Sequence, residues 1–565
     1  MAGTSIRTAP SHAQPGAAWD PNHRHEIRSH VMRNVRQHES NQGVKRPTGR
    51  GRARRINRDR KVDKASSADA GTPTTPIHTA AQETDSQFPA RPVSSESPTS
   101  RLRYGQVDPY AMPLYSSPSG DYGLDRFCDS SQNSLSETAM RGLLSYATTH
   151  FIPMTFPVEN RNSNLEVANH IVVDRVLEAS RPAFFAFLAT TACHRAVLHR
   201  RHSELGADGP SANCDRIRDR EFILAHRSAI TETNDKAKGG VLDSDYLEAC
   251  VSIISTLTLA GDFNVARQYL HSLLDVLQHV ELSPPTAAWL PLTDAKVAVG
   301  LMSRPQVPLP WARVQIEDGS LQRMLPPADD PLLRMGSAFA TVSGLSTELQ
   351  RLLCDATLIC LMCDFNARDV VGLRPHEHIS FRCKSMELEH DLLSYVFDIF
   401  PVSAERADGL EPTPDVPLTE DVVRLAVLGL MTMISVHVLP GSGLGRAMTR
   451  QQMRAMTRWF ASNLNGQQSL GEKMTGNTSD TAALHTILWA LFVFAKCARE
   501  QPEEEALRKM LAEVMTRLQM SDWDDIEHIL YGFLYVPTML RPPWWRTWEL
   551  VEGIICAANG EQQPY

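Results

Sequence analysis

Hydrophobic positions along most of this chain recur with the period of an α-helix. From residue 134 onward, apolar side chains return every three or four positions, and the alternation typical of strands is nearly absent. Gly, Pro or acidic residues separate successive apolar stretches, as expected between helices. The pattern predicts an all-α fold, in which stacked helix pairs form a large helical domain.

The apolar stretches define a series of expected helices. Capping residues support several starts, with Thr419, Ser479 and Ser521 each placed before acidic residues. A Gly261-Asp262 break predicts that the helices on its two sides form an antiparallel pair. The expected ranges are 182–201, 218–233, 244–260, 263–281, 346–366, 378–399, 419–438, 448–463, 479–499, 502–519 and 522–535.

The first hundred residues have a different composition. Half of residues 65–100 are Pro, Ser or Thr, and Phe88 is their single aromatic side chain. Such a stretch cannot bury enough apolar surface to offset its ordering entropy, so we expect disorder apart from a turn or two of helix at 26–38. The predicted organisation is a disordered basic arm and linker over 1–103, followed by the helical domain over 104–565.

Charge is distributed unevenly between these two parts. Residues 1–64 hold fifteen Lys/Arg against five Asp/Glu, a surplus of ten positive charges. Because the whole chain carries −8, residues 65–565 carry −18. A short basic arm on a large acidic body is typical of a protein addressed to the nucleus or to nucleic acid.

The basic run at 45–61 is broken by Pro and Gly, which leaves its cations accessible. It can serve as a nuclear localisation signal, and contact with DNA phosphates is the alternative that the sequence leaves open. Any such DNA contact is expected to be weak and non-specific. The candidate residues are Lys45, Arg46, Arg50, Arg52, Arg54 and Arg55.

No membrane or secretory segment is expected. The two most apolar stretches, 422–439 and 482–498, are shorter than the ~20 residues that a spanning helix needs. The N-terminus lacks the apolar region of a signal peptide. The chain is therefore expected to be soluble, intracellular and, given its basic arm, nuclear.

The ten cysteines favour buried thiols over metal ligands. Only Cys360 and Cys363 form a C-x2-C pair, and with Cys354 they lie in an apolar, helix-like run without a second ligand pair. His376 and His378 are two residues apart and do not share a helix face. We therefore expect no structural metal and no cofactor.

Neither a catalytic signature nor a nucleotide site is predicted. The glycine-rich segment 441–446 follows a long, acid-capped helix, so we interpret it as a helix stop and loop rather than a phosphate turn. No nucleophile elbow, zincin motif or P-loop is present, and we expect no enzyme. The aromatic segment 542–548 is expected to bury Trp544, Trp545 and Trp548 against the last helices.

Several short motifs together resemble the fungal-specific transcription factor domain family. The segment IRSHVMRNVRQH (27–38) resembles that family's N-terminal basic element, and DPYAMPLY (108–115) precedes the helical region. GDFNVARQYLHSLLDVLQHV (261–280), DAKVAVGLMSRPQVPLPW (294–311) and a terminal Trp-containing helix (523–548) follow in a similar order. The basic motif itself consists of Arg28, Ser29, His30, Met32, Arg33 and Arg36.

The resemblance implies transcription regulation by an all-helical nuclear domain. Proteins of this family commonly begin with a six-cysteine zinc cluster that reads DNA, whereas this chain has no cysteine before Cys128. The expected partners are a nuclear import receptor, the transcription machinery or other regulators and, as an option left open, a second copy of the chain. The alternative is a non-catalytic helical interaction scaffold without a transcriptional role.

Overall fold

The computed structural model is all-α, as the hydrophobic period predicts. Its described residues are 124–128, 134–160, 176–177, 179–205, 213–240, 242–277, 280, 284–401, 414–463 and 478–561. They belong to one compact unit, Ser116–Tyr565. Within these ranges the chain forms helices without strands, and an isolated bridge joins His202 to Ile217. The predicted arm and linker, 1–103, lie outside the described residues.

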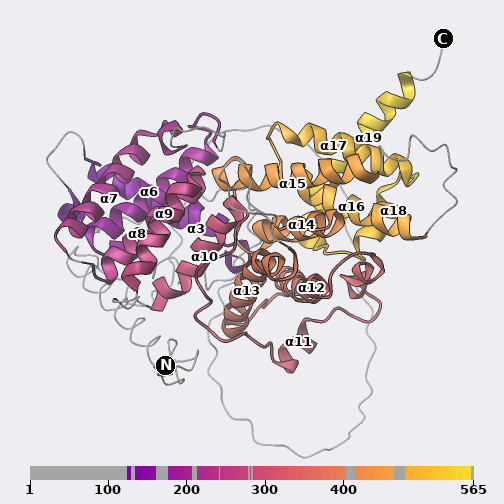
Figure 1. Cartoon of the computed structure of the whole chain (residues 1–565), viewed down its shortest axis with the longest axis horizontal. Coiled ribbons are helices and arrows are strands. Elements are labelled where there is room, and N and C mark those ends of the chain that lie inside the picture. The colour runs from indigo at the N-terminus through magenta and orange to yellow at the C-terminus, as the bar shows by residue number, and fades with distance from the viewer. Residues whose placement is uncertain are drawn as a thin grey trace, which may run out of the picture. The chain divides into compact units, whose positions relative to one another are not determined.

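The first group of helices packs around α6 (Arg181–Leu198), coloured purple in Figure 1. Its apolar side chains are buried over almost the whole length, from Pro182 to Val197, so it forms the centre of one hydrophobic core. The other helices of this part are η1 (Leu124–Phe127), α2 (Glu137–Tyr146), η2 (Ala147–Phe151), α3 (Ile152–Thr155), α4 (Pro157–Asn160), η3 (Asn213–Arg216), α7 (Arg220–Lys238), α8 (Ser244–Ala260) and α9 (Phe263–Leu277).

The second group surrounds α16 (Thr478–Cys497), whose side chains from Thr486 to Val493 are inaccessible to solvent. A second core forms here, and Leu301 packs against both cores. The remaining helices are α10 (Pro284–Leu301), α11 (Asp318–Met324), η4 (Pro331–Arg334), η5 (Ser337–Thr341), α12 (Thr347–Arg368), α13 (Pro375–Ile399), α14 (Leu418–Ile434), α15 (Gly443–Asn463), α17 (Glu503–Arg517), α18 (Trp523–Leu530) and α19 (Pro537–Glu561).

The two most apolar stretches of the sequence are core helices. They correspond to α14 and α16, which pack against each other within the second core. Among the described residues, no helix is both long and apolar enough to cross a membrane.

The predicted pair of helices around Gly261-Asp262 is confirmed as α8 and α9. Gly261 has a φ of 96°, in the left-handed region that ends many helices and that glycine adopts without strain. Its backbone N–H donates to the carbonyl of Leu257, which closes the last turn of α8. The chain then reverses, and α9 packs back against α8.

The glycine-rich segment 441–446 differs from its prediction at one point. A helix precedes it, as predicted, but α15 begins at Gly443 rather than at 448. Ser442 initiates the helix, because its hydroxyl accepts a hydrogen bond from the Gly445 N–H at 3.1 Å. A Cβ on Gly443 would lie 2.2 Å from the backbone nitrogen of Gly261, so glycine permits close packing here.

The predicted terminal helix is wrong as a single element. Residues 523–548 divide into α18 and the start of α19, because a turn around Gly532 ends one helix and Pro537 opens the next. The N-cap of α18 is Asp522, not Ser521. The same region buries Trp544 completely and Trp548 partly, as predicted, whereas Trp545 remains 37% exposed.

Candidate functional site

The residues that the sequence nominated for import or nucleic-acid contact cannot be placed. The basic run, the N-terminal basic motif and the segment 108–115 all lie outside the described residues. The basic run comprises Lys45, Arg46, Arg50, Arg52, Arg54 and Arg55, and the basic motif comprises Arg28, Ser29, His30, Met32, Arg33 and Arg36.

The Gly-Asp motif at 261–262 holds two distant parts of the chain together. The buried Asp262 carboxylate accepts hydrogen bonds from the backbone N–H groups of Asn213, at 2.5 Å, and Cys214, at 2.8 Å. The Asn213 side-chain amide in turn donates to the Gly261 carbonyl at 3.0 Å. A carboxylate that accepts two backbone N–H groups fixes their positions strongly, so this motif anchors η3 at the turn between α8 and α9.

A second aspartate of the resembling motifs, Asp294 of α10, holds the segment that follows this helix. We call residues 302–317, which join α10 to α11 in an extended course, the strap. Asp294 accepts hydrogen bonds from the strap N–H groups of Gln306, at 2.6 Å, and Val307, at 2.7 Å. Burial raises the pKa of Asp294 to about 6, although the two backbone N–H groups act in the opposite direction.

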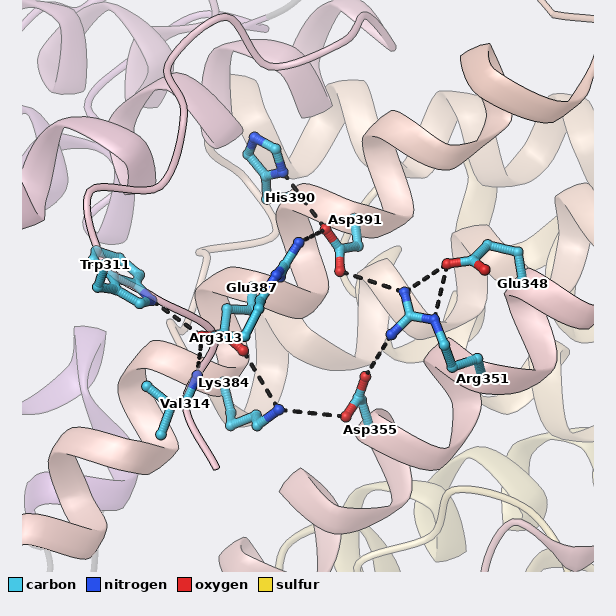
Figure 2. Close-up of polar contacts among 10 residues, drawn as sticks. All are labelled: Trp311, Arg313, Val314, Glu348, Arg351, Asp355, Lys384, Glu387, His390 and Asp391. Atoms are coloured by element: carbon cyan, nitrogen blue, oxygen red, sulfur yellow. Dashed lines mark hydrogen bonds and ion pairs between the residues drawn. The ribbon is translucent and has the colours of Figure 1, made fainter. Parts of the chain in front are cut away.

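The strap then runs along α13, where a buried glutamate holds it. Figure 2 shows the Trp311 indole and the Val314 backbone directed at the same carboxylate oxygen of Glu387, with distances of 3.1 and 2.9 Å. The second oxygen of Glu387 lies 3.5 Å from the Lys384 ammonium group, one turn earlier on α13. Arg313 of the strap also pairs with Asp391 of α13. The strap is therefore fixed at several points along one helix.

A network of alternating charges connects α12 to the same face of α13 (Figure 2). Arg351 of α12 lies between three carboxylates, Glu348 at 2.6 Å, Asp355 at 3.3 Å and Asp391 at 3.7 Å. Asp355 also faces the Lys384 ammonium group at 3.6 Å. Positive and negative groups alternate, so each carboxylate of this face has a cationic neighbour.

Asp391 is the acid that the strap, α12 and α13 share. Burial alone would raise its pKa, but the adjacent His390 and the Arg313 guanidinium outweigh burial and hold the pKa below its usual value. The carboxylate is therefore ionised at neutral pH and remains paired. Asp391 is not free to act as a general acid.

A buried ion pair joins α10 to α13 beneath the strap. The Lys296 ammonium group lies 2.6 Å from one carboxylate oxygen of Glu389, and their side chains are 8% and 2% exposed. The other oxygen of Glu389 has no hydrogen-bond partner. Such a pair is costly to desolvate, and either charge alone would cost more, so the two residues depend on each other.

The contacts of the strap, α12 and α13 hold chain segments in position, and they occupy the charged groups of this face. Asp294 and Glu387 fix the strap, while Asp391 and Arg351 fix α12 relative to α13. A general base needs a free acceptor within reach of a substrate, which these carboxylates do not offer. The geometry therefore favours a structural use of this face.

The His-Glu-His segment at 376–378 and the cysteines of α12 also have structural roles. Glu377, between His376 and His378, is buried in the first turn of α13, where it accepts a hydrogen bond from Arg374 N–H and pairs with Arg323. Cys360 and Cys363 lie in the second core, as predicted, whereas Cys354 is exposed, contrary to its expected place in the core. The described ranges contain no group of three His, Cys, Asp or Glu side chains arranged to hold a metal ion.

Sequence reasoning did not identify the network on α12 and α13. Glu387 and Trp311 are 76 positions apart, and Lys296 and Glu389 are 93 apart. One signal was present, since α13 carries three acids within five residues, at 387, 389 and 391, in a stretch that also contains Met386, Leu388, Leu392 and Leu393. Buried acids need partners, so this cluster could have been nominated.

Comparison with known proteins adds no relative. No protein-family model, no curated protein and no solved structure matches this chain.

Proposed function

We propose that the chain is a fungal transcription-factor-like regulatory protein that acts in the nucleus through its helical domain. The proposal combines the basic arm, the family resemblance and a helical domain whose charged groups serve to position segments. It assigns no enzymatic activity and no zinc-cluster DNA reader. The protein would reach its sites of action through a nuclear import receptor and act through the transcription machinery or other regulators.

The observation that carries the proposal concerns two residues of the resembling motifs. Asp262 and Asp294 belong to separate motifs, and each buries a carboxylate that accepts two backbone N–H groups from a distant segment. Residues with such contacts are needed for the fold itself, because they hold separate segments of the chain in place. That both motif aspartates have this role supports a relationship in fold to the family, and hence a regulatory domain.

The arm and the helical domain have separate tasks in this proposal. The surplus of ten positive charges in residues 1–64 can bind an import receptor or phosphate groups, whereas the remaining chain, at −18, would be repelled by a polyphosphate. The basic run is therefore expected to determine nuclear accumulation. The helical domain would then provide the contacts with other regulators.

Fluorescence imaging of a tagged six-residue variant tests this division. Replacing Lys45, Arg46, Arg50, Arg52, Arg54 and Arg55 with Ala should move the protein to the cytoplasm while leaving its thermal stability unchanged. A matched control removes six exposed cations of the helical domain and should stay nuclear. That control consists of Arg218, Arg220, Arg227, Lys238, Arg454 and Lys509, each replaced with Ala.

The outcomes separate the proposal from its alternative. Equal nuclear signal in the six-residue variant and the wild type would refute the import role of the basic run. Exclusion of the wild-type protein itself from the nucleus would refute the regulatory proposal and favour a cytoplasmic scaffold.

A further inference from the structure

The last two helices carry exposed carboxylates around an exposed tryptophan. α18 and α19 contact each other through three indole rings. The centroid of the Trp523 ring, on α18, lies 5.5 Å from that of Trp545 and 6.1 Å from that of Trp548, both on α19. The rings of Trp545 and Trp548 are themselves 5.0 Å apart. These contacts bring the start of α18 against the middle of α19.

Five exposed carboxylates lie on the two segments that these rings join. Asp522 caps α18, and two more acids follow in its first turn. On α19, Glu549 and Glu552 lie four and seven positions after Trp545, so they share its face of the helix. We call Trp545 and the five acids together the acidic–aromatic surface. The acids are Asp522, Asp524, Asp525, Glu549 and Glu552.

The charges of this surface are not neutralised by neighbouring cations. Among the described residues, no ion pair joins any of the five carboxylates to a Lys, Arg or His side chain. By contrast, Glu505 on the exposed face of α17 pairs with Lys509 at 2.7 Å. Arg541 of α19 pairs instead with Glu527, at 3.2 Å. Residues 522–552 hold six Asp/Glu against two Arg, so this part of the domain carries −4.

Trp545 gives the surface a group that can recognise a particular kind of cation. Its side chain is 37% exposed, and its indole N–H donates to the Glu549 carboxylate at 2.8 Å, which holds the ring beside a negative charge. A guanidinium group stacks favourably on an indole face, and its N–H groups match a carboxylate in geometry. The surface therefore fits an Arg-rich segment.

The bland explanation is that the acids only keep this surface hydrated and that Trp545 lies at the rim of an aromatic cluster. The chain itself, however, carries a segment of complementary charge. Residues 45–61 hold nine Lys/Arg against one Asp, or +8. Residues 62–123, sixty-two in all, connect this run to the first described residue, and in extended form they can span up to about 200 Å. Reach does not prevent the contact.

We propose that the basic run 45–61 binds to the acidic–aromatic surface of the same chain. The five carboxylates pair with its cations, and an Arg guanidinium stacks on the Trp545 ring. Linkage within one chain gives the run a high effective concentration at the surface. The bound run is covered, so an import receptor or DNA must displace the surface before it can bind the arm. This autoinhibitory consequence rests on the proposed function, whereas the contact itself does not.

Carbodiimide cross-linking of the purified full chain tests the contact, because it joins an ammonium group to a carboxylate only where the two meet. Mass spectrometry should find Lys45 or Lys61 joined to acids of the acidic–aromatic surface at low salt. These cross-links should decrease at least about tenfold at about 1 M sodium chloride, which screens charges beyond ~3 Å. Their yield should not change on dilution. A yield that falls on dilution would show that a second copy supplies the run, which contradicts binding within one chain.

Trypsin cleavage of the basic run in the folded full chain provides a comparison of variants. Replacing the five acids with their amides should speed cleavage within 45–61 at least about fivefold, because cleavage follows the population of released arm. Asn also caps helices and exposed substitutions change stability little, so the fold should remain intact. Trp545→Leu should speed cleavage too, and an unchanged rate would refute the stacking. The variant carries Asp522→Asn, Asp524→Asn, Asp525→Asn, Glu549→Gln and Glu552→Gln.

A matched control neutralises five exposed acids elsewhere in the domain, and its basic run should be cleaved as slowly as that of the wild type. The control carries Asp235→Asn, Asp275→Asn, Asp329→Asn, Glu505→Gln and Glu513→Gln. Absence of the cross-links at low salt would overturn the proposal, as would equal cleavage of the run in wild type and the five-residue amide variant. Both measurements use purified protein, so their result is independent of the imaging test of nuclear accumulation.

Discussion

The face of α13 under the strap and the last turn of α16 treat charge in opposite ways. On α13, Glu387 and Asp391 each have several partners, and Arg351 lies among three carboxylates. In the last turn of α16, Lys496 has no anionic partner among the described residues. The charges of the first region are paired within the chain, whereas the Lys496 ammonium group is not.

The difference teaches where a ligand can be accommodated. A charged group that is already paired would have to lose a partner before it could bind anything, and this loss offsets the gain. An unpaired group has nothing to lose and is already desolvated. The paired face of α13 is therefore expected to determine stability rather than binding.

The largest expected effect on stability concerns the ion pair between Lys296 and Glu389. Glu389→Leu leaves a buried ammonium group without its partner and should destabilise the fold by about 3–5 kcal/mol. Adding Lys296→Met removes that orphan charge, and the double variant should recover most of the loss. Urea denaturation of the four proteins in this cycle gives the coupling free energy.

The cycle also provides the test of pairing itself. If Lys296→Met and Glu389→Leu have additive effects on the free energy of unfolding, the two residues are not coupled. That result would contradict the claim that charge pairing on α13 determines stability.

A smaller, pH-dependent effect is expected at Asp294. Because its folded pKa of about 6 lies above the unfolded value, the folded state binds more protons between about pH 4 and 6. This contribution to stability is therefore present at low pH and is lost as pH rises through 6, by up to about 2–3 kcal/mol. Denaturation of wild type and Asp294→Asn across this range should show the difference between them falling as pH rises.

A flat difference between wild type and Asp294→Asn would show that the carboxyl has an ordinary pKa. In that case the two strap N–H groups balance the effect of burial, and the carboxyl ionises as pH rises from about 4, as it does in the unfolded chain.

The smallest effect is expected at Arg351, despite its three carboxylate neighbours. Its side chain is 52% exposed, so solvent screens these pairs, and Arg351→Met should cost less than about 1 kcal/mol. Thermal unfolding at low and high salt measures this cost, which should shrink further at high salt. A loss of several kcal/mol would mean that the network on α12 and α13 acts as one buried unit.

Local signals predicted the helices whose residues follow one clear rule. The α8–α9 pair is an example, because Gly261 marks the end of one helix and an amphipathic stretch follows directly. Most of α10 was not predicted as a helix, because Pro291 lies inside it and its second half is buried on almost all sides, Asp294 and Lys296 included, which obscures the helical period. Pro542 and Pro543 likewise prevented the prediction of α19 as one continuous helix.

The candidate sites depended on information that the sequence does not contain. Glycines at 441–445 suggested a loop, but the close contact of Gly443 with Gly261 depends on two helices meeting. Charge patterning along the chain, by contrast, identified the basic arm directly.

The central claim, a nuclear regulator addressed by its basic arm, is tested most directly by chromatin immunoprecipitation. The tagged full chain is compared with a version lacking residues 1–64, and with that version joined to an unrelated nuclear import sequence. We expect enrichment at discrete genomic sites for the full chain, its loss on truncation, and its return when import is restored. Uniform background for the full chain, in cells where it is nuclear, would contradict the claim.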